Sequence, residues 1–278
     1  MSHSVNGPSS FSRRRSCPAS MQMELGIKDK ESVYAQEGSA AHALGEKCLE
    51  TGKQPQDFLG QKFGEFKFPD GKVEEFLVDG DMVEAVQVYV DHCRPLINNS
   101  TMIEKKLDLP FLGPDKHSKT GHVRGTADFI SLHDRILHVV DYKHGKGVVV
   151  DVKENIQGLS YGMGAANHFE KEDWDILRIT IVQPRAFGSK QVKSWDASRS
   201  DILDWKMDFS EAALNTFLPD ANINPSVDCR FCKALYLCKG IINLIKEITG
   251  MDLLKDGSSP MDIHKLSEDQ ISEILFKK

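Results

Sequence analysis

The chain has 278 residues, of which 40% are hydrophobic, and a formal net charge of −6 at pH 7. This length and composition indicate a soluble globular chain with one substantial core and appended pieces. The longest apolar runs have the length of strands, which excludes a transmembrane helix and makes a membrane partner unexpected. The negative charge does not exclude a DNA-binding protein, because binding depends on local patches of charge.

The first and last segments differ in composition from the rest of the chain. Residues 1–12 are rich in Ser and Gly, and we expect them to be disordered. A capping box at Ser267 and Gln270 predicts a helix in the tail, residues 241–278. The main domain is therefore expected to span residues 13–240.

Within this domain the pattern predicts an amphipathic helix at 31–51, which carries His42 and Glu46 on one face. The later elements, in chain order, are a strand at 101–109, a Pro- and Gly-rich loop at 110–121, two apolar strands that carry Asp128 and Asp141, a helix at 154–168, a strand at 178–183 and a helix at 198–216. This order predicts an α/β fold with a mixed central sheet flanked by helices.

The two apolar strands carry the strongest chemical signal. If their hairpin turns near Asp134–Arg135, Asp128 falls opposite Asp141, where paired side chains lie about 5 Å apart. Asp141 and Lys143 point to the same face because side chains alternate along a strand. Two carboxylates and an ammonium on one apolar sheet face are costly to desolvate unless they are used. An ion-paired hairpin is the plain alternative; a divalent metal that activates water beside a phosphate would use all three groups.

The helix at 154–168 follows directly and carries Gln157 and Tyr161 four residues apart, on one face. Its three glycines, Gly158, Gly162 and Gly164, weaken the helix but allow it to lie close to a backbone or a nucleic acid strand.

These motifs in this order resemble the PD-(D/E)xK nuclease superfamily. The resemblance rests on Gly125-Thr-Ala-Asp128, Val139-Val-Asp141-Tyr-Lys143 and Gln157-Gly-Leu-Ser-Tyr161, and the last of these points to the RecB-like exonuclease branch. Glu37-Gly-Ser-Ala-Ala-His42 resembles the first helix of that branch. The resemblance covers roughly residues 12–240, and over this range the chain is similar to a phage-encoded RecB-like group. It implies a restriction-endonuclease-like fold.

Three of the six cysteines form a C-x2-C-x5-C run, Cys229, Cys232 and Cys238. Such a run suits one tetrahedral or polynuclear metal centre, with Cys17 as the candidate fourth ligand. The first residues are polar and Arg13–Arg15 precede no apolar run, so we expect no secretory signal and a cytoplasmic location. A reducing cytoplasm argues against disulfides, while a zinc knuckle stays open. Cys48 and Cys93 are interpreted as packing residues.

The same resemblance implies a [4Fe–4S] cluster, because relatives with one cysteine before the nuclease core and three after it bind one. We favour this cluster over Zn²⁺. Its ligands would join the N- and C-terminal segments as a staple across some two hundred residues, where cross-linking removes the most chain entropy.

The resemblance also implies roles at the active site. Asp128 and Asp141 would hold Mg²⁺ or Mn²⁺, with His42 and the backbone carbonyl of Tyr142 as further ligands. Lys143 would orient or deprotonate the attacking water, while Gln157 and Tyr161 would fix the DNA strand or support Lys143. Glu46 is a possible partner of His42, and Glu104 a possible carboxylate for a second metal ion.

The function expected from these features is metal-dependent DNA exonuclease activity in phage recombination or processing, in the cytoplasm of a bacterial host. Its partners would be DNA, as single strands or duplex ends, and a single-strand annealing or recombination protein. Three alternatives stay open: an exonuclease of the CRISPR-adaptation type, a metal-stapled DNA-binding module that does not cleave, and an α/β scaffold with a zinc knuckle.

Overall fold

The computed structural model describes residues 5–27, 33–67 and 73–249. The chain divides into two compact units, and each of them is made of segments that are separated in the sequence. The first, here called the sheet unit, comprises Lys30–Leu109 and Arg124–Asp204. The second, here called the cysteine unit, comprises Met1–Asp29, Pro110–Val123 and Trp205–Lys278.

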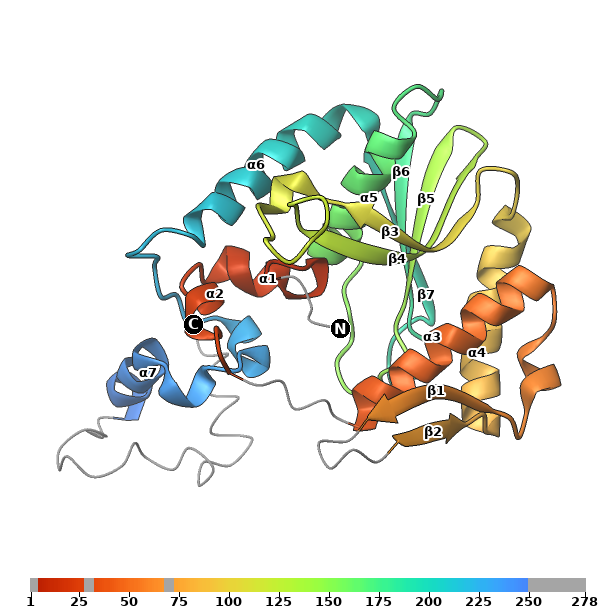
Figure 1. The fold of residues 1–278 in the computed structure, drawn as a ribbon, viewed down its shortest axis with the longest axis horizontal. Coiled ribbons are helices and arrows are strands. Elements are labelled where there is room, and N and C mark those ends of the chain that lie inside the picture. Colours follow the sequence, from red (N-terminus) through yellow and green to blue (C-terminus); the bar gives the residue numbers. More distant parts are fainter. Residues whose placement is uncertain (1–4, 28–32, 68–72, 250–278) are drawn as a thin grey trace. The chain divides into compact units, whose positions relative to one another are not determined.

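In the described residues of the sheet unit, five strands form one sheet in the order β3-β4-β5-β6-β7 (Figure 1). The strands are β3 (Met102–Asp108), β4 (Arg124–His133), β5 (Ile136–Tyr142), β6 (Ile176–Val182) and β7 (Val192–Ser198). Only β5 and β6 are parallel neighbours in this sheet. Parallel neighbours need a crossover, which α5 (Ile156–His168) supplies. The expectation of a mixed sheet flanked by helices is confirmed.

One face of the sheet packs against α3 (Val33–Thr51) and α4 (Gly80–Cys93). The sheet contributes Phe129, Val140 and Tyr142 to this core, and all three are buried. Since side chains alternate along each strand, Asp141 belongs to the opposite face. The sequence pattern correctly predicted α3, and it also predicted the strands β3 to β6.

The opposite face packs against α5, which lies on the other side of the sheet from α3 and α4 (Figure 1). The approach is close because α5 has glycines where it meets β6. A Cβ atom on Gly158 would lie 2.5 Å from Ile179, and one on Gly162 would lie 2.5 Å from Leu177. The predicted close approach of this helix is therefore confirmed for the sheet, although the glycines meet side chains of the strands and not their backbone.

Several elements of the sheet unit were not predicted from the sequence. They are the strand β7, the helix α4 and the antiparallel hairpin of β1 (Lys62–Lys67) and β2 (Val73–Leu77). The start of α4 has a clear local cause, since the Asp79 side chain accepts a hydrogen bond of 2.8 Å from the Met82 N–H. Asp79 is thus the sequence signal that could have located α4.

The cysteine unit contains short helices and loops. Its helices are α1 (Pro8–Ser16), α2 (Ser20–Met23), most of α6 (Ile202–Asn215) and α7 (Lys239–Thr249). Phe11 of α1 is fully buried, and its ring lies 5.4 Å from that of Phe209 in α6. The prediction that residues 1–12 are disordered is therefore wrong for residues 8–12. Pro8 opens the helix, and burial of Phe11 stabilises it despite the polar composition around it.

The predicted helix of the tail extends into residues 250–278, which lie outside the described residues. The helix at 198–216 is confirmed as α6, preceded by a 3-10 turn at Arg199–Asp201. Among the described helices, none combines the length and the apolar character that a membrane span requires.

The close packing of α5 can be tested with a pair of glycine variants. We expect Gly162→Ala to destabilise the protein by about 1–2 kcal/mol, because overpacking against buried Leu177 outweighs the gain in helix propensity. Gly38 also lies within a helix, and a Cβ there would meet nothing within 4 Å. Gly38→Ala should therefore stabilise by about 0.5–1 kcal/mol. Urea denaturation of both variants measures the difference, and equal shifts would contradict the packing argument.

Candidate functional site

The β4–β5 hairpin places the two predicted aspartates beside each other. His133 pairs with Ile136, so the turn falls at Asp134 and Arg135, whose φ angles are 49° and 61°. Positive φ at both central residues is typical of a type I′ turn, which suits the twist of a hairpin. Asp128 and Asp141 lie one residue beyond the Phe129–Val140 pair of this register. The predicted turn position is confirmed.

Lys143 is held between the sheet and α5. Its Nζ lies 2.9 Å from Oδ2 and 3.1 Å from Oδ1 of Asp141, and it donates a hydrogen bond of 2.8 Å to the Gln157 side-chain carbonyl. The Gln157 amide in turn donates to the Tyr161 hydroxyl at 3.4 Å. The Asn155 side chain caps α5 by accepting from the Gly158 N–H, which fixes the helix start beside Lys143. The structure thus brings together four of the predicted site residues.

Asp128 is 7% exposed and meets a second set of predicted residues. Its Oδ2 accepts a hydrogen bond of 2.7 Å from the Tyr142 N–H, and its Oδ1 lies 3.4 Å from Nδ1 of His42. Glu104 lies 3.6 Å from the same His42 nitrogen. Among the described residues, His42, Glu104 and Asp128 form the group of potential metal ligands whose atoms all lie within 4.8 Å of one another.

Glu104 reaches this group from a distorted strand. Its neighbours Ile103 and Lys105 pair regularly with β4, yet Glu104 itself has a φ of 46°. A non-glycine residue with positive φ within a strand is strained by about 1–3 kcal/mol and occurs mostly where a site requires it. The distortion occurs at the position that carries the third ligand of the group. From the sequence, Glu104 was expected only as a possible carboxylate for a second metal ion.

Two other predictions for this site are not supported by a contact. The predicted ligand atom of Tyr142 is its carbonyl oxygen, whereas the contact that the structure gives to the group is made by its N–H. The second is the predicted pairing of Glu46 with His42. In the described part of the chain, His42 forms ion pairs with Asp128 and Glu104. Glu46 is instead a neighbour of Glu104, since burial and the Glu104 charge together raise the pKa of Glu46.

The electrostatics of the site favour a bound cation. Burial alone would lower the pKa of His42, but the Asp128 and Glu104 carboxylates raise it to about 10. Burial also works to lower the pKa of Lys143, and the charges of Asp141 and Asp128 outweigh it, so that this pKa is raised. Burial raises the pKa of Asp141. A proton on His42 thus offsets part of the acidic charge, and a divalent ion can take its place.

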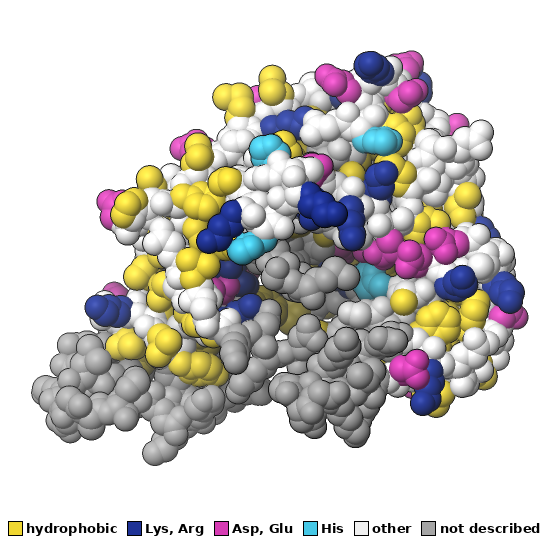
Figure 2. Space-filling view, in the orientation of Figure 1, with side chains coloured by type: hydrophobic (Ala, Val, Ile, Leu, Met, Phe, Trp, Pro, Cys, Tyr) yellow, Lys and Arg dark blue, Asp and Glu magenta, His cyan; other side chains and the backbone are white. Residues whose placement is uncertain are grey.

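A divalent metal fits these residues by two observations. The donor set is carboxylate oxygens and one imidazole, which suits Mg²⁺ or Mn²⁺. Oδ2 of Asp141 is buried and has no hydrogen bond of acceptable geometry, although the Lys143 ammonium lies nearby. An oxygen left in this state is available to a ligand. Acidic side chains also gather beside a histidine on the face of the molecule that Figure 2 shows.

A network of hydrogen bonds next to this site was not predicted from the sequence. The Tyr142 hydroxyl lies 2.8 Å from Nδ1 of His144, whose Nε2 lies 3.2 Å from a carboxylate oxygen of Glu37. Arg185 donates to the same Glu37 oxygen at 2.6 Å and also contacts His144. Burial lowers the pKa of His144 to about 4, with the Arg185 charge acting in the same direction. A neutral imidazole therefore supports Tyr142, whose ring packs edge-on against His42 at 5.3 Å.

Two residues of this network could have been located from the sequence. His144 follows Lys143, and Arg185 follows β6, whose C-terminal end lies beside that of its parallel neighbour β5. Residues after two parallel strands meet at one edge of the sheet. Glu37 belongs to the motif that ends at His42, but its contacts with His144 and Arg185 depend on how α3 packs.

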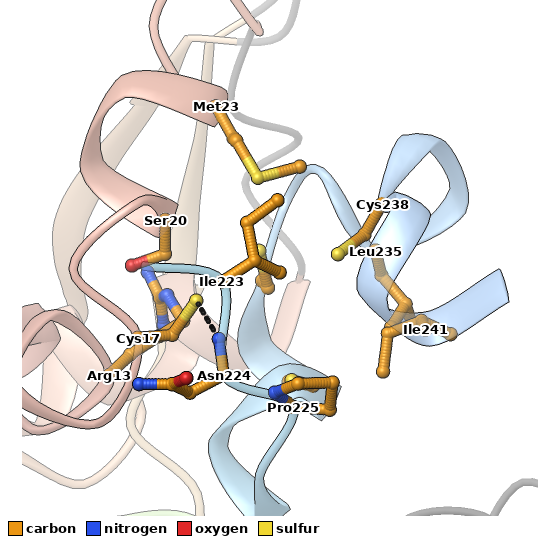
Figure 3. A pocket seen from close by; sticks show the side chains of 12 residues that line it. Arg13, Cys17, Ser20, Met23, Ile223, Asn224, Pro225, Leu235, Cys238 and Ile241 are labelled. Atoms are coloured by element: carbon orange, nitrogen blue, oxygen red, sulfur yellow. Dashed lines mark hydrogen bonds between the residues drawn. The ribbon is translucent and has the colours of Figure 1, made fainter. Parts of the chain in front are cut away.

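The four predicted cluster cysteines line one pocket of the cysteine unit (Figure 3). Figure 3 shows the sulfurs of Cys17 and Cys238 on opposite sides of it, with Ile223 between them. The remaining wall is largely apolar, and none of the cysteines forms a disulfide. Among the described residues, no three of these sulfurs lie within 4.8 Å of one another.

Backbone groups point at two of these sulfurs. The Asn224 N–H donates to Sγ of Cys17 at 3.4 Å, and the Ser226 N–H donates to Sγ of Cys229 at 3.2 Å. Burial raises the pKa of the Cys229 thiol, and it raises that of Cys232 to about 11. Without a cation these thiols stay protonated, and a metal centre would be needed to hold them as thiolates.

The N- and C-terminal segments also meet through Glu24, directly after α2. Its carboxylate lies 3.0 Å from Nε of Arg13 and 2.6 Å from Nη2 of Arg14. It also accepts a hydrogen bond of 3.0 Å from the Lys233 N–H. A buried ion pair therefore connects the two segments that line the pocket.

Comparison with known families identifies the chain. Residues 3–278 match the model of a family described as "Protein of unknown function (DUF2800)". Because this match covers nearly the whole chain, the protein belongs to that family.

The metal site can be tested by Mn²⁺ titration. We expect the wild-type protein to bind Mn²⁺ and to gain about 2.7 kcal/mol of stability at about 100 times the dissociation constant. Asp128→Asn should weaken binding at least tenfold, because it removes a charged ligand. Asp196→Asn, which alters an exposed carboxylate paired with Arg178, should leave binding unchanged. Calorimetry measures both, and equal affinity in the Asp128 variant and the wild type would exclude this site.

Proposed function

We propose that this DUF2800 protein is a Mg²⁺- or Mn²⁺-dependent deoxyribonuclease of the PD-(D/E)xK type, related to the RecB-like exonucleases. One observation carries the proposal. Lys143 contacts both Asp141 and Gln157, directly beside the His42–Glu104–Asp128 group. A half-buried lysine between an acidic metal site and a helical glutamine is a suitable arrangement for phosphodiester hydrolysis.

The fold supports the finer assignment to a restriction-endonuclease-like architecture. The site residues come from an antiparallel hairpin, from the parallel crossover that follows it and from a helix on each face. This is the arrangement that the sequence motifs imply. Fold alone does not carry function, so the argument depends on the geometry of the side chains.

His42, Glu104 and Asp128 would hold the metal ion, and Asp141 offers Oδ2, which the Lys143 ammonium contacts, from the adjacent strand. The bound ion would act as a Lewis acid that activates water and neutralises charge on the scissile phosphate. The Tyr142 N–H orients the Asp128 carboxylate, and the Tyr142 ring buttresses the imidazole of His42.

Lys143 would stabilise the negative charge that develops on the phosphate and orient the attacking water. Its pKa is raised by Asp141 and Asp128 against the effect of burial, so it carries a proton at neutral pH. A protonated lysine donates hydrogen bonds and is not a general base. Gln157 would hold the Lys143 ammonium in place, and Tyr161 would hold Gln157.

The cysteine pocket supports the second part of the proposal, a structural [4Fe–4S] cluster bound by Cys17, Cys229, Cys232 and Cys238. Four thiolates around one zinc ion, at Zn–S distances of about 2.3 Å, would lie about 4 Å apart. The sulfurs line one pocket, and in the described chain no three of them lie within 4.8 Å of one another, a spacing that favours a polynuclear centre. The N–H groups that donate to Cys17 and Cys229 are typical of the hydrogen bonds around cluster sulfurs.

The biological role proposed with this chemistry is DNA processing during phage recombination, in the host cytoplasm and together with a single-strand annealing protein. A non-cleaving DNA-binding module is the alternative that the following experiment distinguishes.

The nuclease proposal is tested on end-labelled linear DNA with Mg²⁺ or Mn²⁺. We expect the wild-type protein to release label progressively. Asp141→Ala and Lys143→Ala should each lower the rate at least about 100-fold, since each removes charge stabilisation or positioning. Asp196→Asn serves as the matched control and should cleave normally. If the wild type and both site variants bind DNA and are equally inert, the protein is a binding module.

The cluster proposal is tested by iron and sulfide analysis of anaerobically purified protein. We expect about four irons and four sulfides per chain in the wild type, and a loss of both in Cys229→Ser. Cys48→Ala alters a cysteine in the core of the sheet unit and should retain the full content. Loss of the centre should also lower the thermal midpoint, because metal binding is coupled to folding. Zinc without iron in the wild type, or a Cys229→Ser protein that stays fully active and stable, would refute the cluster.

A further inference from the structure

Two loops lie next to the candidate site at the end of the sheet where β5 and β6 finish. The segment 144–150 follows Lys143, and the segment 184–191 joins β6 to β7. The Lys143 N–H donates to the Val182 carbonyl at 2.8 Å, which continues the parallel pairing up to the start of both loops. Together these two segments are here called the rim.

Gln183 fastens the two parts of the rim to each other. This side chain is 2% exposed. Its amide donates to the carbonyls of Val148 at 2.7 Å and Gly145 at 3.3 Å, while its carbonyl accepts from the Val150 N–H at 2.9 Å. A buried glutamine with all of these bonds orders both loops at once. The rim is therefore a defined surface, not a pair of independent loops.

The rim exposes apolar side chains that a folded domain ordinarily buries. Phe187 is 98% exposed, and Val148 and Val149 are 40% and 49% exposed. The adjacent Gly188 has a φ of 72°, so the turn that presents Phe187 is built into the backbone. A bulky aromatic ring held in solvent by a defined turn is a feature of binding surfaces.

The charged side chains of the rim itself are all cationic. Residues 144–150 and 184–191 contain three cationic side chains and no Asp or Glu, in a protein whose net charge is −6. The cations are Lys146, Arg185 and Lys190. Arg185 is engaged by Glu37, and Lys146 makes an exposed ion pair of 3.5 Å with Asp81. The surface therefore combines an exposed aromatic ring with cationic side chains, next to a site proposed to cleave DNA.

We infer that the rim binds the unpaired strand of a DNA substrate, with a base stacked on Phe187 and phosphates along its cationic side chains. This inference rests on the proposed nuclease function and extends it to a substrate class, single-stranded DNA or a duplex end with an unpaired overhang. Only an unpaired base presents its face to an aromatic ring, whereas a duplex keeps its bases stacked.

The inference is tested by the affinity for single-stranded oligonucleotides that contain 2-aminopurine, measured with the full-length holoprotein in Ca²⁺ to prevent cleavage. We expect Phe187→Ala to weaken binding roughly 5- to 150-fold and to remove the quenching that stacking causes. Phe187→Trp should restore both properties. Ile97→Ala, which removes another exposed apolar side chain of the sheet unit, should bind like the wild type. Affinity for blunt duplex DNA should be the same in all four proteins.

Cleavage kinetics with Mn²⁺ then separate this inference from the proposed function. In Phe187→Ala we expect a raised KM on single-stranded DNA with kcat unchanged, because Phe187 lies outside the metal site. If the wild type cleaves DNA and Phe187→Ala shows unchanged affinity and KM, the inference is wrong and the nuclease proposal stands. If single-strand binding depends on Phe187 but the wild type does not cleave, the nuclease proposal fails and the rim remains a DNA contact. If the wild type does not bind single-stranded DNA, the inference is overturned.

Discussion

The fold of the sheet unit requires partners that offset the negative charge of two carboxylates buried side by side. Asp128 and Asp141 are 7% and 2% exposed, on adjacent strands of an otherwise apolar sheet. A buried charge whose partner is removed costs about 3–5 kcal/mol. Each carboxylate therefore has its own set of partners: Lys143 for Asp141, and His42 with the Tyr142 N–H for Asp128. His42 belongs to α3, and Lys143 is itself held by Gln157 of α5, so these charges also connect the sheet to both helices.

Tyr142 connects the buried carboxylate of Asp128 to residues farther from the site. The backbone N–H of Tyr142 holds Asp128, its ring contacts His42, and its hydroxyl is bonded to His144. His144 is in turn positioned by Glu37 and Arg185. On the other side of Asp128, the strand β3 accommodates a strained residue, Glu104, whose carboxylate reaches His42. Strain of this kind persists only where the surrounding structure determines it, and here regular pairing holds β3 on both sides of Glu104.

In the cysteine unit, short helices are ordered around a small core by other interactions. Glu24 joins the segment of Arg13 and Arg14 to the backbone of Lys233, in positions that exclude most solvent. Four cysteines line the adjacent pocket, and burial raises the pKa of two of them, Cys229 and Cys232. Desolvated thiols disfavour the charged form, so a metal centre there would stabilise both the thiolates and the joined segments. Direct ion pairing and the proposed cluster therefore act on the same two ends of the chain.

Local patterns in the sequence determined several elements by themselves. The alternation of apolar residues and the turn at Asp134–Arg135 predicted the β4–β5 hairpin, and this register placed Asp128 beside Asp141. The spacing of Gln157 and Tyr161 predicted their common face on α5. These predictions succeeded because each depends on neighbours within one element or one tight turn, where backbone geometry leaves few alternatives.

Other features were decided only by tertiary structure. Residues 8–12 have a polar composition typical of disorder, and they are helical because Phe11 is buried against a residue about two hundred positions away. The contacts of Glu37 with His144 and Arg185, the distortion at Glu104 and the exposure of Phe187 likewise have no local signature. The physical reason is the same in each instance: contacts between distant segments and the burial that results from them override local propensity, and a single sequence does not encode them as a periodic pattern.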